Sequence, residues 1–353
     1  MMKKLVNFAS SLLAIVAGLL FGLLILFITN SQDAMAGFQT ILAGGLSNGI
    51  SGVGQVLYLA TPIIMTGLSV GFAFKTGLFN IGASGQFTLG AFVAVYIGIK
   101  GSFLGPVHWI VALIAAGIAG AIWGFIPGIL KAIFNVNEVI SSIMMNYIGM
   151  YFVNMLVFRN IYDSGRNQSL PVASTALIPK AGLNTLFRAR NLNIGIFIAL
   201  FFVILMYILL EKTTFGYELK ACGQNKDAAK YAGINSKRNI ALSMTIAGAL
   251  AGIGGALLYL AGSGKYLQVV DIIAPEGFSG ISVALLGLSN PIGILFSGIF
   301  IAHIIVGGNY LQLYNYVPEV IDMIISVIIY CGAFSLLFRA VLKKMITRRE
   351  EKK

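Results

Sequence analysis

Charged side chains are scarce in this sequence of 353 residues. They make up 10% of the chain, whereas hydrophobic residues make up 58% and the mean hydropathy is +0.89. A soluble domain typically has about 25% charged residues. No single water-soluble core could enclose so much apolar surface, so the composition predicts a protein whose solvent is largely the lipid bilayer.

Cysteine and histidine are also nearly absent. Cys222, Cys331, His108 and His303 stand alone, without the spacing of a disulfide framework or of a metal site. We therefore expect no metal ligand set. The net charge of +12 does not indicate a nucleic-acid partner, because the basic residues cluster between and after apolar segments.

Long apolar runs are the main feature of the sequence. A helix needs about 20 apolar residues to cross the hydrocarbon core. Candidate spans are 7–28, 53–74, 78–99, 108–130, 138–158, 192–210, 240–261, 279–290, 291–308 and 317–338. The eighth is too short to cross alone, and Asn290-Pro291 predicts a broken or re-entrant helix near 279–308. The fold class predicted is all-α: one polytopic transmembrane bundle, over residues 1–353, with about ten spans.

Basic residues predict the orientation of these spans. With the N-terminus inside, the cytoplasmic side holds most of the Lys and Arg residues, including those of the segment 211–239 and of the basic tail 339–353. That bias favours both termini in the cytoplasm and a long outer loop at 159–190. Ala34-Met35-Ala36 resembles a signal-peptidase site, but the preceding apolar run is longer than a signal peptide uses, so we expect an uncleaved span.

Ionisable groups are rare inside the spans, which argues against an ion-coupled carrier and favours a passage for a neutral polar solute. Neutral polar residues that could line such a passage are Asn80, Gln86, Asn137, Ser141, Asn146 and Ser282. Each of them could instead join neighbouring helices by hydrogen bonds. Two small-residue ridges, Gly120/Gly124/Gly128 and Gly248/Gly252/Ala256, predict close helix packing.

An enzymatic alternative rests on Gly82-Ala83-Ser84-Gly85, which matches the G-x-S-G of rhomboid intramembrane proteases. A serine nucleophile requires a base within hydrogen-bond reach. His303 is the candidate base, but it lies 219 positions away and lacks the spacing of the rhomboid histidine helix. We therefore expect no catalytic residues.

The segment 211–239 is the long polar stretch between two predicted spans. Asn225 is a suitable N-cap, Asp227 falls in the first turn, and Gly233 is a natural stop, so a helix of about 10 Å is predicted between them. Its alanines would allow close approach to a soluble partner, with Lys226, Lys230 and Tyr231 fixing the register. A solvated connector is the alternative.

Residues 213–234, TTFGYELKACGQNKDAAKYAGI, resemble the coupling-helix segment of permeases in the ribose and branched-chain amino acid branch of ATP-binding-cassette importers. Phe79-Asn80-Ile81-Gly82 with Gly85-Gln86 is similar to a second signature of that branch. Asn137-Glu138-Val139-Ile140-Ser141 and the loop 159–190 resemble its nucleoside-importing subgroup, whose binding component is a basic membrane lipoprotein.

The resemblance implies a permease of the bacterial plasma membrane that imports nucleosides by alternating access, with three protein partners. These are a second permease, usually a different chain, a cytoplasmic ATPase and an outer substrate-binding lipoprotein. ATP would bind the partner ATPase, and this sequence contains no G-x-x-x-x-G-K-[ST] motif. The coupling role falls to Gly223, Asn225, Ala228, Ala229 and Gly233. Import of a simple sugar, or ion-coupled transport, remains as an alternative.

Overall fold

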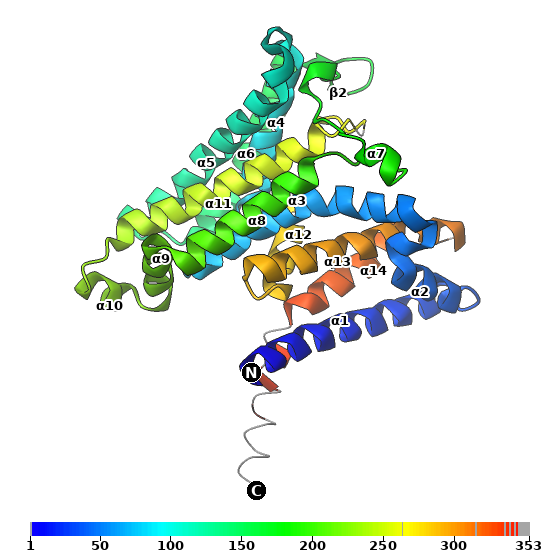
Figure 1. The fold of residues 1–353 in the computed structure, drawn as a ribbon, viewed down its shortest axis with the longest axis horizontal. Helices are drawn as coiled ribbons and strands as arrows, with labels where there is room; N and C mark the ends of the chain where they lie inside the picture. Colours follow the sequence, from blue (N-terminus) through cyan, green and yellow to red (C-terminus); the bar gives the residue numbers. More distant parts are fainter. Residues whose placement is uncertain are drawn as a thin grey trace, which may run out of the picture.

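The computed structural model describes residues 2–262, 264–314, 316–334, 337–338, 340–341 and 344. Helices account for nearly all of its regular structure, with a single two-stranded hairpin (Figure 1). The α-helices are α1 Met2–Thr29, α2 Ala34–Ala43, α3 Gly49–Lys75, α4 Ala83–Lys100, α5 His108–Phe134, α6 Glu138–Asn160, α7 Leu183–Leu186, α8 Gly195–Lys212, α9 Thr214–Gln224, α10 Lys226–Tyr231, α11 Ser236–Tyr259, α12 Pro275–Leu286, α13 Pro291–Asn309 and α14 Pro318–Ala333. The strands are β1 Tyr162–Asp163 and β2 Gln168–Ser169.

The all-α class predicted from composition is confirmed, whereas the count of ten spans is not. Each predicted range contains a helix, but in the described part seven helical stretches are long and apolar enough to cross a bilayer. α12 has 12 residues and α14 has 16. At 1.5 Å per residue α12 is about 18 Å long, well short of a hydrocarbon core of about 30 Å.

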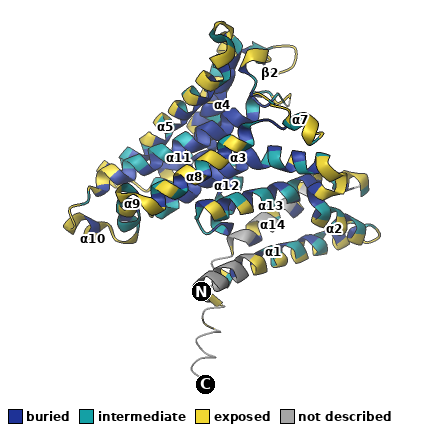
Figure 2. Cartoon of the chain, in the orientation of Figure 1, coloured by how far each residue is buried: buried dark blue, intermediate teal, exposed yellow. Residues whose placement is uncertain are grey.

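The close helix packing predicted for the two small-residue ridges is present, and the two ridges pack against each other. A Cβ added to Gly120 would collide with the carbonyl oxygen of Gly248, and one added to Gly124 would collide with that of Met244. α4 joins them, because Gly90 lies against the backbone of Gly252. Close backbone approach of this kind stabilises helix packing in a bilayer, because lipid tails are as apolar as the helix surfaces and leave no hydrophobic driving force between helices. Figure 2 shows buried residues concentrated on α3, α4 and α11, at the centre of the bundle.

The predicted break near Asn290-Pro291 is present between α12 and α13. Leu288 and Ser289 have φ values of 54° and 52°, which turn the chain sharply. The Asn290 side chain then accepts hydrogen bonds from the amides of Ile292 at 3.0 Å and Gly293 at 3.3 Å, and Pro291 opens α13. α12 starts at Pro275, four residues before the predicted start, because a proline suits the first helical turn.

A second layer consists of α1, α2, α13 and α14, which share an apolar cluster that includes Leu26, Ile41, Ile304 and Ile324. The Tyr316 hydroxyl donates to the carbonyl of Asn30 at 3.0 Å and so fastens the end of α1. The predicted basic tail 339–353 lies almost wholly outside the described residues.

The helices of the main bundle lead to two ends (Figure 1). One end carries α9 and α10, and we call it the α10 end. The other carries the hairpin, α7 and the stretch after α11, and we call it the loop end. Residues 161–194 are fastened there, because Ala173 and Ile178 donate backbone hydrogen bonds to Gly98 at 2.8 Å and Leu260 at 3.0 Å. The His108 ring, bonded to Thr175 Oγ1 at 2.9 Å, adds a third link.

Candidate functional site

The polar segment between α8 and α11 folds as two helices rather than one. α10 is the short helix predicted from the sequence, and the Asn225 side chain caps it by accepting from the amides of Asp227 and Ala228, each at 3.0 Å. Gly233, with a φ of 80°, terminates it as predicted. α9, of 11 residues, was not predicted. Its signals were present in the sequence: Thr213 caps it, and Gly216, Leu219 and Cys222 recur every three residues on its buried face.

The two alanines of α10 face different ways. Ala228 is exposed, whereas Ala229 is 4% exposed and packs inside its own chain. The prediction that both alanines form one open face is therefore wrong for Ala229, because a two-turn helix lying on its neighbours buries one side. Tyr231 is 94% exposed. A cavity of about 540 Å³ lies beside this helix, lined by Lys226, Asp227, Lys230 and residues 233–237.

α9 is fixed to three other helices. Glu211 of α8 pairs with Lys220 at 3.1 Å, and Asn239 of α11 donates to Glu218 at 3.0 Å. At Gly223 the helix touches the end of α3: an added Cβ would lie 2.6 Å from the Lys75 carbonyl oxygen and 2.8 Å from the Gly77 nitrogen. A displacement of α9 must therefore displace residues 75–77.

Residues 76–82 lead from that contact into a buried polar cluster. Asn80 and Gln86 exchange two amide hydrogen bonds, of 2.9 and 3.1 Å, and Asn80 also donates to Ser69 Oγ at 3.2 Å. Asn80 and Gln86 are both fully buried. The paired amides satisfy each other, which an apolar interior requires. The predicted span 78–99 begins later, at Ala83, because this pairing holds 78–82 outside the helix.

α6 joins the cluster through Asn146. Its side-chain oxygen accepts from the Gly85 amide at 2.8 Å, and its nitrogen donates to the Ile81 carbonyl at 3.0 Å. The hydroxyls of Ser84 and Ser142 are buried here without a hydrogen-bond partner in the described part of the chain. The structure thus brings together three of the six predicted pathway residues: Asn80, Gln86 and Asn146.

The other three predicted pathway residues lie apart from this cluster. Asn137 caps α6 by accepting from the Val139 amide at 2.9 Å, and the Ser141 hydroxyl donates to the carbonyls of Asn137 and Glu138, each at 3.2 Å. Glu138, in the first turn of α6, is also paired with Lys131 at 2.9 Å. Ser282 is half-buried on α12.

The structure does not support the protease alternative. Ser84 lies against Gly277 of α12, at a contact so close that a methyl group on Gly277 would collide with it. His303 lies on α13, where its Nε2 is 3.0 Å from the carbonyl oxygen of Leu42. Because the two are engaged with different elements, the described residues contain no serine–histidine pair of this kind.

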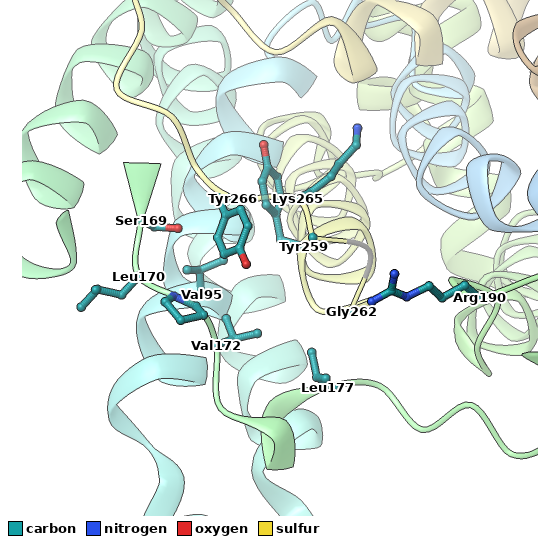
Figure 3. A pocket seen from close by; sticks show the side chains of 12 residues that line it. Val95, Ser169, Leu170, Val172, Leu177, Arg190, Tyr259, Gly262, Lys265 and Tyr266 are labelled. Carbon is teal, nitrogen blue, oxygen red and sulfur yellow. The ribbon is translucent and has the colours of Figure 1, made fainter. Parts of the chain in front are cut away.

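Two cavities lie on the loop-end side of the polar cluster. Sequence reasoning missed them, because their walls combine helix residues with the irregular stretch after α11. The first, of about 240 Å³, lies between Val95, the loop 169–177 and Tyr266, with Arg190 and Lys265 on the side opposite Leu170 (Figure 3). The second, also about 240 Å³, runs along α4 and α6 past Phe87, Thr88 and Met150. Tyr259 and Tyr266 line both cavities.

Comparison with known proteins gives a consistent result. Residues 52–333 match the family described as the permease component of the branched-chain amino acid transport system. The chain is 38% identical to the guanosine ABC transporter permease protein NupP of Bacillus subtilis, over 98% of each chain. It is 34% identical to the nucleoside ABC transporter permease protein NupB of Lactococcus lactis, over 94% of this chain and 92% of that one.

A further relative transports a sugar by its name. The glucose ABC transporter permease protein TsgB13 of Haloferax volcanii is 30% identical, over 79% of this chain and 74% of its own length. No solved structure matches the chain. The apolar helices and the family match over most of the sequence agree on a multi-pass protein of the plasma membrane. The chain belongs to the family of ABC transporter permeases that contains the permease component of the branched-chain amino acid transport system.

Proposed function

We propose that this chain is the membrane-spanning subunit of an ATP-driven importer of nucleosides. The observation that carries the proposal is the similarity to the guanosine permease protein of Bacillus subtilis, which extends over 98% of both chains. The interior fits a neutral solute, because the buried polar cluster consists of amides and hydroxyls and contains no charged side chain. The proposed path leads from the loop end, past Asn146 and Gln86, to the α10 end.

The second part of the proposal is that α10 is the contact for a separate cytoplasmic ATPase, which binds and hydrolyses the ATP. Ala228 and Tyr231 present the exposed surface to that partner, while Asn225 and Gly233 define the ends of the helix. Ala229 anchors α10 to its own chain, and Gly223 connects α9 with residues 75–77. Closure of the ATPase would then move α10, α9 and the start of α4 together, which is a mechanical basis for alternating access.

The third part concerns orientation and partners. The α10 end and both termini lie in the cytoplasm and the loop end faces outward, as the excess of basic residues in 211–239 supports. A second permease, a different chain, completes the passage, and a substrate-binding lipoprotein docks at the loop end. ATP depletion should therefore stop uptake, whereas collapse of ion gradients at constant ATP should not.

Import of a simple sugar is the second candidate, because the glucose permease protein of Haloferax volcanii is also a relative. Uptake of labelled guanosine, adenosine, cytidine, ribose and glucose by cells with and without the gene separates the two. We expect nucleoside uptake to depend on the gene and sugar uptake to be unaffected. Gene-dependent uptake of sugars, with nucleoside uptake unaffected by the gene, would identify a sugar as the substrate. Uptake of every solute without the gene would refute both candidate substrates.

A further inference from the structure

The two cavities on the loop-end side are neighbours, because the side chains of Tyr259 and Tyr266 line both of them. Each is about 240 Å³. Small-molecule sites measure about 300–1,000 Å³, so each cavity alone is smaller than such a site and the neighbouring pair falls within the range. We call this pair of cavities the tyrosine chamber. The exposed residues Arg190 and Lys265 line its first cavity on the side opposite Leu170 (Figure 3).

Aromatic surface is the main feature of the chamber wall. The two tyrosines are half-buried, and both contribute to the wall of each cavity. Phe87 adds a third ring in the deeper cavity. Flat rings of this kind bind planar bases by stacking, and they do so with little dependence on which base is present.

Charges of both signs line the chamber, with Arg190 and Lys265 in the first cavity and Glu276 in the second. The Glu276 carboxylate, in the first turn of α12, is 3.8 Å from the Lys265 ammonium. Glu276 and the amide of Gln268 both line the deeper cavity. A carboxylate accepts hydrogen bonds from sugar hydroxyls, and an amide both donates and accepts. Aromatic rings together with a carboxylate and an amide suit an uncharged solute with one planar ring and several hydroxyls.

A close contact between α4 and α12 lies on the α10 side of the chamber. Thr88 lines its deeper part, and Ser84 lies one helical turn further along α4. There Ser84 meets Gly277 of α12 at backbone distance, which leaves no room for a solute between these two helices. The paired amides of Asn80 and Gln86 lie beyond this contact. Cavities on the loop-end side and close helix contact on the α10 side are the arrangement expected of one state of alternating access.

We propose that the tyrosine chamber is the transit site for a nucleoside, with the base stacked on Tyr266 and Tyr259 and the ribose hydroxyls hydrogen-bonded to Glu276. This inference rests on the proposed function and adds to it the place and the manner of substrate contact. The contact is weak, since a solute held tightly in a pathway does not leave it. A sugar without a base lacks the stacking contact.

Substitution of Tyr266 tests the proposal in cells that carry the complete transporter. Tyr266→Ala should lower guanosine uptake at subsaturating concentration about tenfold, because the stacking contribution to binding is lost, and Tyr266→Phe should stay within about twofold of the wild type. Tyr151→Ala, on the exposed face of α6, is the matched control and should not differ from the wild type. Copurification of each variant with its partners checks that it folds.

Photolabelling provides a second readout that does not depend on uptake. Purified transporter is illuminated with 8-azidoguanosine, and labelled peptides should come from α11 and residues 264–276. Excess guanosine should prevent labelling, whereas glucose should not. Normal uptake by Tyr266→Ala, equal losses in the Ala and Phe variants, or labelling elsewhere would overturn the chamber assignment alone. A wild-type transporter that imports no nucleoside would overturn the proposed function and this inference with it.

Discussion

Buried amides define the start of α4. Asn80 and Gln86 each supply one donor and one acceptor to the other, and Asn146 does the same for two backbone groups of the neighbouring turn. Inside a membrane protein an unpaired polar group costs several kcal/mol, so amides that satisfy each other hold three elements in a single arrangement. The sequence predicted that polar residues gather here, but it could not show that they pair, because pairing depends on how the chain turns between 80 and 86.

Gln86→Ala tests the structural role of the amide pair. It leaves the buried Asn80 amide without its main partner, and we expect a loss of about 1–3 kcal/mol in the free energy of unfolding. The measurement is the thermal unfolding midpoint of the purified complex. Asn80→Ala/Gln86→Ala should cost less than the sum of the single changes, since the two residues interact directly. Additive losses would contradict the pairing.

Ser84→Ala is the matched control on the same helix. The Ser84 hydroxyl has no partner in the described residues, so its removal should leave stability unchanged or raised. Uptake should persist, since no nucleophile is required at this position. Complete loss of uptake in a stable Ser84→Ala protein would mean that the hydroxyl acts in transport.

Tyr231 is the side chain on α10 best placed to contact a partner. Tyr231→Ala should reduce ATP-driven uptake and ATPase copurification at least about thirtyfold, because truncation of an aromatic hot-spot residue costs about 2 kcal/mol of binding or more. The thermal midpoint of the permease itself should not change, as the side chain is 94% exposed. Tyr217→Ala, exposed on α9, is the control. Equal copurification by wild type and Tyr231→Ala would exclude Tyr231 from the contact.

At the scale of elements, α9 connects α10 with the bundle. Its buried face packs on α8, and Gly223 fits between backbone atoms of Lys75 and Gly77. The ends of α10 were predictable, because Asn225 and Gly233 act locally. The burial of Ala229 and the joint at Gly223 were not predictable, since both depend on neighbours far away in the sequence.

Gly223→Ala tests this joint. The added methyl group would approach three backbone atoms of residues 75–77 at 2.6 to 2.8 Å, so α9 must shift. We expect a loss of about 1–3 kcal/mol in stability and a fall in uptake of at least about fivefold, with ATPase copurification retained. Gln224→Ala, exposed at the next position, should match the wild type in all three measurements. Unchanged uptake by Gly223→Ala would show that motion does not pass through this contact.

On the scale of the whole molecule, a central bundle connects the α10 end with the loop end, which carries the two cavities. Composition was sufficient to predict the all-α membrane fold, because it depends on summed hydropathy. Composition did not settle the number of membrane crossings. α12 is too short to cross, and residues 264–274, which lead into it, are irregular. The tyrosine chamber could not be foreseen, because that irregular stretch forms much of its wall.

Thiol labelling tests the orientation of the molecule. Cys222 is buried and cannot report on it, so an exposed residue is replaced instead. Lys230→Cys on α10 should react with a membrane-impermeant maleimide in inside-out vesicles only, whereas Gly165→Cys in the loop 161–194 should react in intact cells. Both residues are exposed in the structure. The opposite pattern would invert the topology.

Crosslinking from α10 shows whether an ATPase binds this chain there. A photoreactive benzoylphenylalanine is placed at Tyr231, cells that contain the whole transporter are illuminated, and the crosslinked protein is identified by mass spectrometry. We expect a crosslink from Tyr231 to an ATP-binding-cassette ATPase, and no crosslink to that ATPase when the same probe is placed at Gly165. Efficient crosslinking from Tyr231 to other proteins, with the ATPase absent among them, would show that α10 is not the ATPase contact.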